Sequence, residues 1–299
     1  MQVNKIDTFS GHRGAVFSLV QGMEEHLFFS AGADGWIVQW NLQKPDVGKA
    51  IAQVEGSVYS MFLEKKNEIL WVGQNNEGIH GIKLADQSRV FSIKLDSLSI
   101  FDMQLFNNQI WVAHNDGLIT VIDFESRNII KHIKVSQKSA RKIVVLDENR
   151  VAVGYSDGYI RLFDKEFNLI DFWQAHANSI FSLTYLKSKN ELISVGRDAR
   201  VKKWYLGQAD FKLNPLEVNG HIYAINDVAL HPNQTLFATA SMDKTIKIWQ
   251  LEEMKLLKVI DAARHGGHKN SVNKLIWTSF DNQLISGSDD KNISVWTIL

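Results

Sequence analysis

Short runs of alternating apolar and polar residues follow one another along this chain, separated by turns. The clearest example lies in residues 267–299. There a strand-like run at 271–277 leads through a polar turn to a second run that begins at Gln283, and the unit closes on a third run at 293–296. Alternation with a period of two over runs this short predicts β-strands that pair as hairpins. Every other segment of the chain is a closer or more distant copy of this unit, so we expect an all-β repeat protein.

Four residue types recur at fixed distances in four of the units. In the last unit, His268 precedes Trp296 by 28 residues, Ser286 precedes it by 10 and Asp290 precedes it by 6. A period near 40 residues indicates a propeller or a solenoid. All three spacings are kept by the sets His12, Ser30, Asp34, Trp40; His176, Ser194, Asp198, Trp204; His221, Thr239, Asp243, Trp249; and His268, Ser286, Asp290, Trp296.

The chemistry of these four side chains favours a structural role. An indole N–H can donate to a hydroxyl, the hydroxyl to an imidazole nitrogen, and the other ring N–H to a carboxylate, so all four polar groups are satisfied when buried. Such a network, called a tetrad below, fixes one strand geometry per repeat. With these spacings the chain resembles the WD40 repeat family over its whole length. The family's Gly-His opening and Trp-Asp close correspond to Gly11-His12, Gly220-His221, Gly267-His268, Trp40-Asn41, Trp249-Gln250 and Trp296-Thr297.

The resemblance implies a single all-β domain over residues 1–299, a seven-bladed WD40-type β-propeller. The chain stops three residues after Trp296, so the last blade lacks its outer strand. The alternating segment 3–9 is expected to supply that strand and close the ring, because an unpaired strand edge is a liability. The repeats are placed at about 11–53, 54–94, 95–135, 136–174, 175–218, 219–266 and 267–299.

The second, third and fourth repeats lack most of the tetrad. Val54 replaces the His of the second repeat, and the third and fourth repeats keep only Asp116 and Asp157. The pairs Asp116-Gly117 and Asp157-Gly158 predict tight hairpins. Removing all members of a buried polar network together can be nearly neutral. We therefore expect these three blades to hold their geometry without a polar network.

Composition narrows the possible functions. Lys plus Arg equals Asp plus Glu, 33 each, so the whole molecule does not attract nucleic acid or an anionic membrane. The absence of Cys excludes disulfides, thiol catalysis and Cys-based zinc sites. The N-terminus has no signal-peptide pattern, and no apolar run is long enough to cross a bilayer. We expect a cytoplasmic protein that is a monomer on its own and carries no cofactor or metal.

One position in each innermost strand, five residues after the repeat's His, suggests a binding surface. In the family this position lies at the rim of the central channel. Aromatic rings and an arginine there are typical of binding hot spots. Packing of these rings as a channel-filling core is the alternative, and in the fourth repeat Lys142 could take the place of Arg141. The predicted partner-binding residues are Phe17, Tyr59, Phe101, Arg141 and Phe181, with Arg197 pointing to the same face, while Asn226 and Asn273 complete the aligned position.

No catalytic residue is predicted. His176, Asp198 and Ser194 resemble a serine-hydrolase set, but the same set occurs four times with a Trp partner, and catalysis would need an exposed hydroxyl with an oxyanion hole. His265 and His268 lack further ligands for a metal site. We therefore expect a non-enzymatic scaffold that binds a peptide or protein partner at the channel rim. A propeller enzyme of the lactone or sugar hydrolase type and a structural subunit of an assembly are the alternatives.

Overall fold

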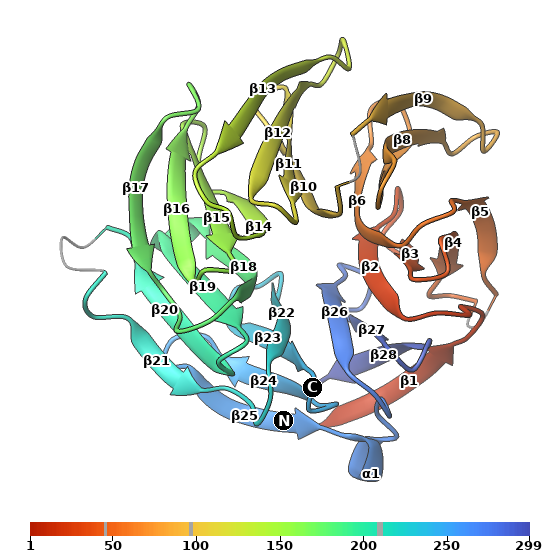
Figure 1. The fold of residues 1–299 in the computed structure, drawn as a ribbon. Coiled ribbons are helices and arrows are strands. Elements are labelled where there is room, and N and C mark those ends of the chain that lie inside the picture. Colours follow the sequence, from red (N-terminus) through yellow and green to blue (C-terminus); the bar gives the residue numbers. More distant parts are fainter. Residues whose placement is uncertain (45–46, 96–97, 208–211) are drawn as a thin grey trace. The chain divides into compact units, whose positions relative to one another are not determined.

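The computed structural model describes residues 1–44, 47–95, 98–207 and 212–299 (Figure 1). Over these residues the regular structure is almost all β-strand, and the only other elements in them are a short α-helix, α1 (Ala262–His265), and a 3-10 turn at Lys187–Lys189. It divides into two compact units, residues 1–97 with 229–299 and residues 98–228. The strands pair in seven four-stranded antiparallel sheets.

Three sheets lie within the first unit. Their strand orders are β2(Val16–Gln21)-β3(Leu27–Gly32)-β4(Trp36–Asn41)-β5(Lys49–Gln53); β6(Val58–Glu64)-β7(Ile69–Gln74)-β8(Gly78–Lys83)-β9(Arg89–Lys94); and β26(Val272–Trp277)-β27(Leu284–Ser288)-β28(Ile293–Ile298)-β1(Val3–Phe9). Each sheet is therefore formed by strands that are consecutive in the sequence, except that the last sheet also contains β1 from the N-terminal end.

Three further sheets lie within the second unit. A fourth, formed by strands between residues 225 and 260, includes residues of both units. Their strand orders are β10(Ile100–Phe106)-β11(Gln109–His114)-β12(Leu118–Asp123)-β13(Ile129–Lys134); β14(Ala140–Val145)-β15(Arg150–Tyr155)-β16(Tyr159–Asp164)-β17(Leu169–Gln174); β18(Ile180–Leu186)-β19(Glu191–Gly196)-β20(Arg200–Tyr205)-β21(Leu216–Asn219); and β22(Ile225–Leu230)-β23(Leu236–Ser241)-β24(Ile246–Gln250)-β25(Lys255–Ile260).

The pairing of the first strand with the last confirms the predicted closure. β1 lies antiparallel to β28, from Val3 opposite Ile298 to Phe9 opposite Ile293, and Figure 1 shows the two strands side by side. The Phe9 ring is buried and stacks on Trp40 at 5.3 Å between ring centres. The seventh sheet is thus completed by the opposite end of the sequence.

Burial explains the pattern of apolar and polar residues along the repeats. The second strand of each sheet is covered on both faces, so a strand such as β19 is buried at every position, whereas most residues of the outermost strand β13 are exposed. In the first unit, Phe29, Ile37, Val58 and Val72 belong to one apolar cluster of the first two sheets. Burial of this apolar surface is the main favourable term in holding neighbouring sheets together.

Candidate functional site

The innermost strands share one irregularity, and it falls on the predicted binding position. In β2, β6, β10, β14, β18 and β26 the pairing register shifts at a single residue, so that this residue has no direct partner on the next strand. A β-bulge of this kind redirects the side chain that it carries and often stands beside a functional site. The residues at the shift, called the bulge residues below, are Phe17, Tyr59, Phe101, Arg141, Phe181 and Asn273.

The bulge also decides between the two candidates in the fourth repeat. In β14, Ala140 lies opposite Tyr155 and Lys142 lies opposite Gly154, so Arg141 is the residue left without a partner. The Lys142 ammonium instead forms an ion pair of 2.9 Å with the buried Asp102. Arg141 therefore occupies the aligned position, and Lys142 has a structural contact.

In the first unit, two of the bulge residues form an aromatic pair. The rings of Phe17 and Tyr59 stack with centres 4.6 Å apart and planes 22° apart. On the other side of β2, the Asn273 amide donates to the Val16 carbonyl at 3.1 Å and to Asp289 at 2.7 Å. Both rings are only partly buried, so the stack keeps an accessible apolar face.

In the second unit, Arg141 lies between two aromatic rings. Its guanidinium carbon is 4.1 Å from the centre of the Phe101 ring and 4.9 Å from that of Phe181. All three side chains are partly buried. Contacts at these distances are attractive cation–π interactions, which help to hold the guanidinium in place. Arg197 is exposed in the turn between β19 and β20, where its backbone N–H donates to the Ser179 carbonyl at 2.8 Å.

The tetrad residues form closed hydrogen-bond networks. In the seventh sheet, the Trp296 indole donates to Ser286 at 2.9 Å, Ser286 lies 2.8 Å from His268 Nε2, and His268 Nδ1 lies 2.9 Å from Asp290. The first and fifth repeats repeat this arrangement, with His12 to Ser30 and His176 to Ser194 both at 2.7 Å. In the sixth, Trp249 donates to Thr239 at 2.9 Å.

Electrostatics in the tetrads fits a structural role. Burial raises the pKa of Asp290, but the hydrogen bond and charge of His268 and the amides of Lys269 and Asn292 outweigh it and hold the pKa at about 2. The pKa values of Asp34 and Asp198 are lowered by similar contacts against the same effect of burial. Each carboxylate therefore stays ionised and bound to its histidine. The Ser194 hydroxyl is fully buried and already engaged, so it offers no accessible nucleophile.

The second and third repeats carry polar networks that the sequence interpretation missed, so the expectation of blades without one was wrong. In the second repeat, His80 joins Gln74 and Ser92 across three strands, with both distances 2.9 Å. In the third, Thr120 lies 3.0 Å from His114 Nε2 and 3.3 Å from His132 Nδ1. The two networks occupy equivalent positions on equivalent strands. Polar residues recur at these positions in the sequence of both repeats, and this recurrence could have predicted the networks.

The fourth repeat keeps part of the tetrad with different partners. Ser136 stands at the position of the tetrad His and donates to Asp157 at 2.8 Å. Arg161 binds the same carboxylate with both of its terminal nitrogens, at 3.1 and 2.8 Å, and lies 4.5 Å from the centre of the Tyr155 ring. A carboxylate with a bidentate arginine and a hydroxyl replaces the histidine network here.

Among the residues that the structure describes, no three or more His, Cys, Asp or Glu side chains are grouped so as to hold a metal ion. None of the helices in these ranges is long and apolar enough to span a membrane.

Known proteins share both sequence and fold with this chain. Residues 3–41, 214–250 and 258–297 match the model of the family described as "WD domain, G-beta repeat". Transducin beta-like protein 3 of Mus musculus is 32% identical over 321 residues, which cover 97% of this chain and 40% of that protein. Target of rapamycin complex 1 subunit mip1 of Schizosaccharomyces pombe is 29% identical over 106 residues, covering 34% of this chain and 8% of that one. The chain spans about 40% of the length of the transducin beta-like relatives.

A solved structure gives the fold. The crystal structure of the WD40 β-propeller domain of Doa1 matches with a TM-score of 0.86 at 18% identity, covering 100% of this chain and 98% of the other. The seven four-stranded sheets correspond to the blades of such a propeller. The chain thus matches the WD40 family in three regions, and its fold is that of a seven-bladed β-propeller.

Proposed function

We propose that this protein is a non-enzymatic scaffold that binds a peptide or protein partner through its bulge residues at the channel rim. Phe17 and Tyr59 supply apolar anchors in one unit, and Phe101, Arg141 and Phe181 supply a mixed apolar and cationic contact in the other. Arg197 adds a second guanidinium. The WD40 relatives point to an interaction scaffold, and the name of one of them makes it a subunit of a protein complex.

The observation that carries the proposal is the identity of the bulge residues. A bulge at the same place in successive strands aims equivalent side chains in the same way. Five of the six are aromatic or arginine, the residue types enriched in binding hot spots. Each is partly buried, so it is held in place yet remains accessible. The enzyme alternative requires a cluster of carboxylates, histidines or a metal at such a site, and the bulge residues carry none.

The test is a comparative affinity purification from the source cell. The native protein is compared with a variant carrying Phe17→Ala, Phe101→Ala and Arg141→Ala. A matched control carries Ile130→Ala, Lys131→Ala and Phe172→Ala, which removes two exposed apolar side chains and one cation from outermost strands. Thermal melts first establish that all three proteins are folded. We expect specific proteins to be recovered with the native and control proteins and lost with the rim variant.

Two outcomes would contradict this assignment. Recovery of the same partners by the rim variant would place the binding surface elsewhere on the molecule. Unfolding of the rim variant, with the control intact, would show that the rings are core residues. Turnover of small ester or lactone substrates by the purified protein would favour the enzyme alternative.

A further inference from the structure

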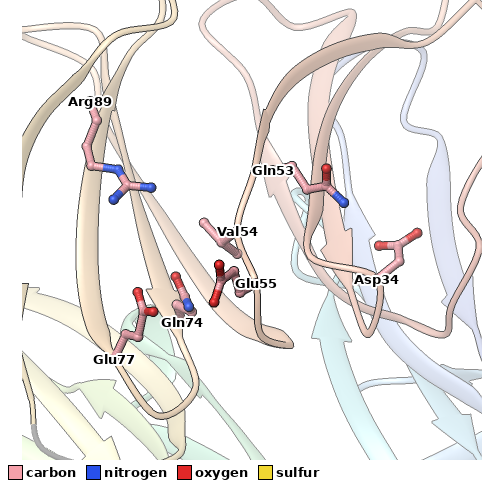
Figure 2. Close-up of a pocket in the computed structure, with 7 residues that line it drawn as sticks. All are labelled: Asp34, Gln53, Val54, Glu55, Gln74, Glu77 and Arg89. Atoms are coloured by element: carbon pink, nitrogen blue, oxygen red, sulfur yellow. The ribbon is translucent and has the colours of Figure 1, made fainter.

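A pocket of about 460 Å³ opens between the first and second sheets, both of which belong to the first unit. It lies at the end of the sheets where the β3–β4 and β7–β8 turns meet the loop that leads from β5 into β6, close in sequence to Tyr59. Figure 2 shows Glu55, Gln74 and Glu77 close together with Arg89 above them, and Gln53 and Asp34 on the neighbouring segment to the right. The residues that line the pocket are Asp34, Gln53, Val54, Glu55, Gln74, Glu77 and Arg89.

The lining is acidic. Three carboxylates and one guanidinium give it a formal charge of 1 − 3 = −2. Asp34 is already bound to His12 and to the backbone N–H of Arg13. Glu77 is half exposed, and its carboxylate lies 3.5 Å from His80. Glu55 is exposed, with no hydrogen bond or ion pair to any residue the structure describes. Two carboxylates are therefore available to a cation that enters the pocket.

A second observation is independent of charge. Gln74 is only 2% exposed, and its Oε1 lies 2.9 Å from His80 Nε2, which donates to it. Its amide nitrogen has no hydrogen-bond partner within the described ranges. This nitrogen is not completely enclosed by protein, so it can donate to water or to a ligand in the pocket that Gln74 lines.

Two of the residues that line the pocket replace glycines of the first repeat. Gly32 of the first repeat has the same register as Gln74, and a Cβ at Gly32 would meet the Ala15 carbonyl oxygen at 1.9 Å. A Cβ at Gly35, the counterpart of Glu77, would meet the Val54 oxygen at 2.0 Å. Side chains at these two positions are therefore excluded from the first repeat and present in the second. The second repeat thus has a carboxylate and an amide at two positions that are glycine in the first, and both line the pocket.

We propose that this pocket binds a basic side chain, an ammonium or a guanidinium, of a partner peptide. Glu55 and Glu77 receive the cation, Val54 contacts its aliphatic stem, and the Gln74 amide donates to the peptide carbonyl beside it. Long cationic side chains commonly lay an apolar stem against protein while the charged end stays with carboxylates or water. The identity of the ligand as part of a peptide rests on the proposed scaffold function; the pocket's preference for a cation does not.

The first experiment uses small probes on the full chain and needs no known partner. Nα-acetyl-arginine amide and Nα-acetyl-lysine amide are titrated and followed by NMR, with Nα-acetyl-norleucine amide as a probe of similar stem and no charge. We expect the cationic probes to bind at least tenfold more tightly than norleucine amide, and binding to weaken as salt is raised. A variant with Glu55→Gln and Glu77→Gln should lose at least tenfold in affinity. The control variant, Glu125→Gln with Glu148→Gln, changes two exposed carboxylates elsewhere and should bind as the native protein does.

The role of Gln74 is tested with a probe that lacks a carbonyl. Gln74→Leu should weaken binding of Nα-acetyl-arginine amide by several fold and leave n-butylguanidine unaffected. Equal binding of norleucine amide, or unchanged binding by the Glu55→Gln, Glu77→Gln variant, would overturn the proposal. Because Glu55 and Glu77 are at the surface, the double variant remains informative even if Gln74→Leu fails to fold.

The partner purification separates this proposal from the function on which it rests. If the Phe17, Phe101 and Arg141 variant loses its partners while the Glu55→Gln, Glu77→Gln variant keeps them, the scaffold function stands and the pocket proposal fails. If the cationic probes bind selectively while the rim variant keeps every partner, the pocket is a cation site and the rim assignment fails.

Discussion

The guanidinium of Arg141 lies 4.1 Å from the centre of the Phe101 ring and 4.9 Å from that of Phe181. Two cation–π contacts on a partly buried group contribute about 1 to 2 kcal/mol to stability in total. Arg141→Ala should therefore lower the free energy of unfolding by about that amount in urea denaturation, and Arg141→Lys by less. Lys131→Ala on the exposed face of β13 serves as the control and should have little effect. An Arg141→Ala variant as stable as the native protein would mean that the rings do not hold the guanidinium.

The tetrads predict that removing a buried tetrad hydroxyl lowers stability much more than removing an exposed hydroxyl. Ser286→Ala leaves the Trp296 indole N–H and His268 Nε2 without their shared partner in a fully buried site. Each buried polar group left unsatisfied costs about 1 to 3 kcal/mol, so a loss of about 2 to 4 kcal/mol is expected by chemical denaturation. The exposed Ser279→Ala should change stability by less than about 0.5 kcal/mol. A loss of similar size in both variants would contradict a stabilising role of the network.

The buried His114 predicts a loss of stability as pH falls. Burial is the main cause that lowers its pKa from 6.5 to about 4 in the folded protein. Because the unfolded chain binds the proton more readily, the contribution of neutral His114 is complete above about pH 6.5 and is lost between pH 6.5 and 4. The shift corresponds to about 3 kcal/mol.

The measurement is the free energy of unfolding of the native protein and of His114→Gln across this pH range. Glutamine occupies the equivalent position in the second repeat, as Gln74, so the fold accommodates it. The difference in stability between the two proteins should shrink by up to about 3 kcal/mol as pH falls from 6.5 to 4. Parallel profiles would show that His114 does not titrate with folding.

Closure by β1 predicts that the N-terminal strand is essential for a stable fold. Deleting residues 2–9 exposes the edge of β28 and removes the buried side chains of Val3 and Phe9. Burial of these two side chains contributes about 3 to 5 kcal/mol, so a markedly lower melting temperature is expected, with aggregation through the open edge seen by size-exclusion chromatography. Ile6→Ser, which changes an exposed residue of the same strand, is the control. An unchanged melt and a monodisperse profile for the deletion would contradict the closure argument.

The sequence by itself determined the repeat, the tetrads and the pairing of β1 with the last sheet. These features depend on local rules. The distance from His268 to Trp296 is set along one stretch of chain, and the alternating segment 3–9 has the pattern of a strand that can pair with β28. The position of Arg141 was left open in the sequence because an alternation can be shifted by one residue, whereas the register of β14 against β15 admits only one bulge residue.

Only the tertiary structure decided what the second, third and fourth repeats contain. Gln74, His80 and Ser92 lie on three different strands, and they meet because of the register of β7, β8 and β9. The pocket at Glu55 and Glu77 depends further on how two sheets pack. Contacts across strands and between sheets depend on register and side-chain volume at positions that are distant in sequence, and no spacing rule along the chain specifies them.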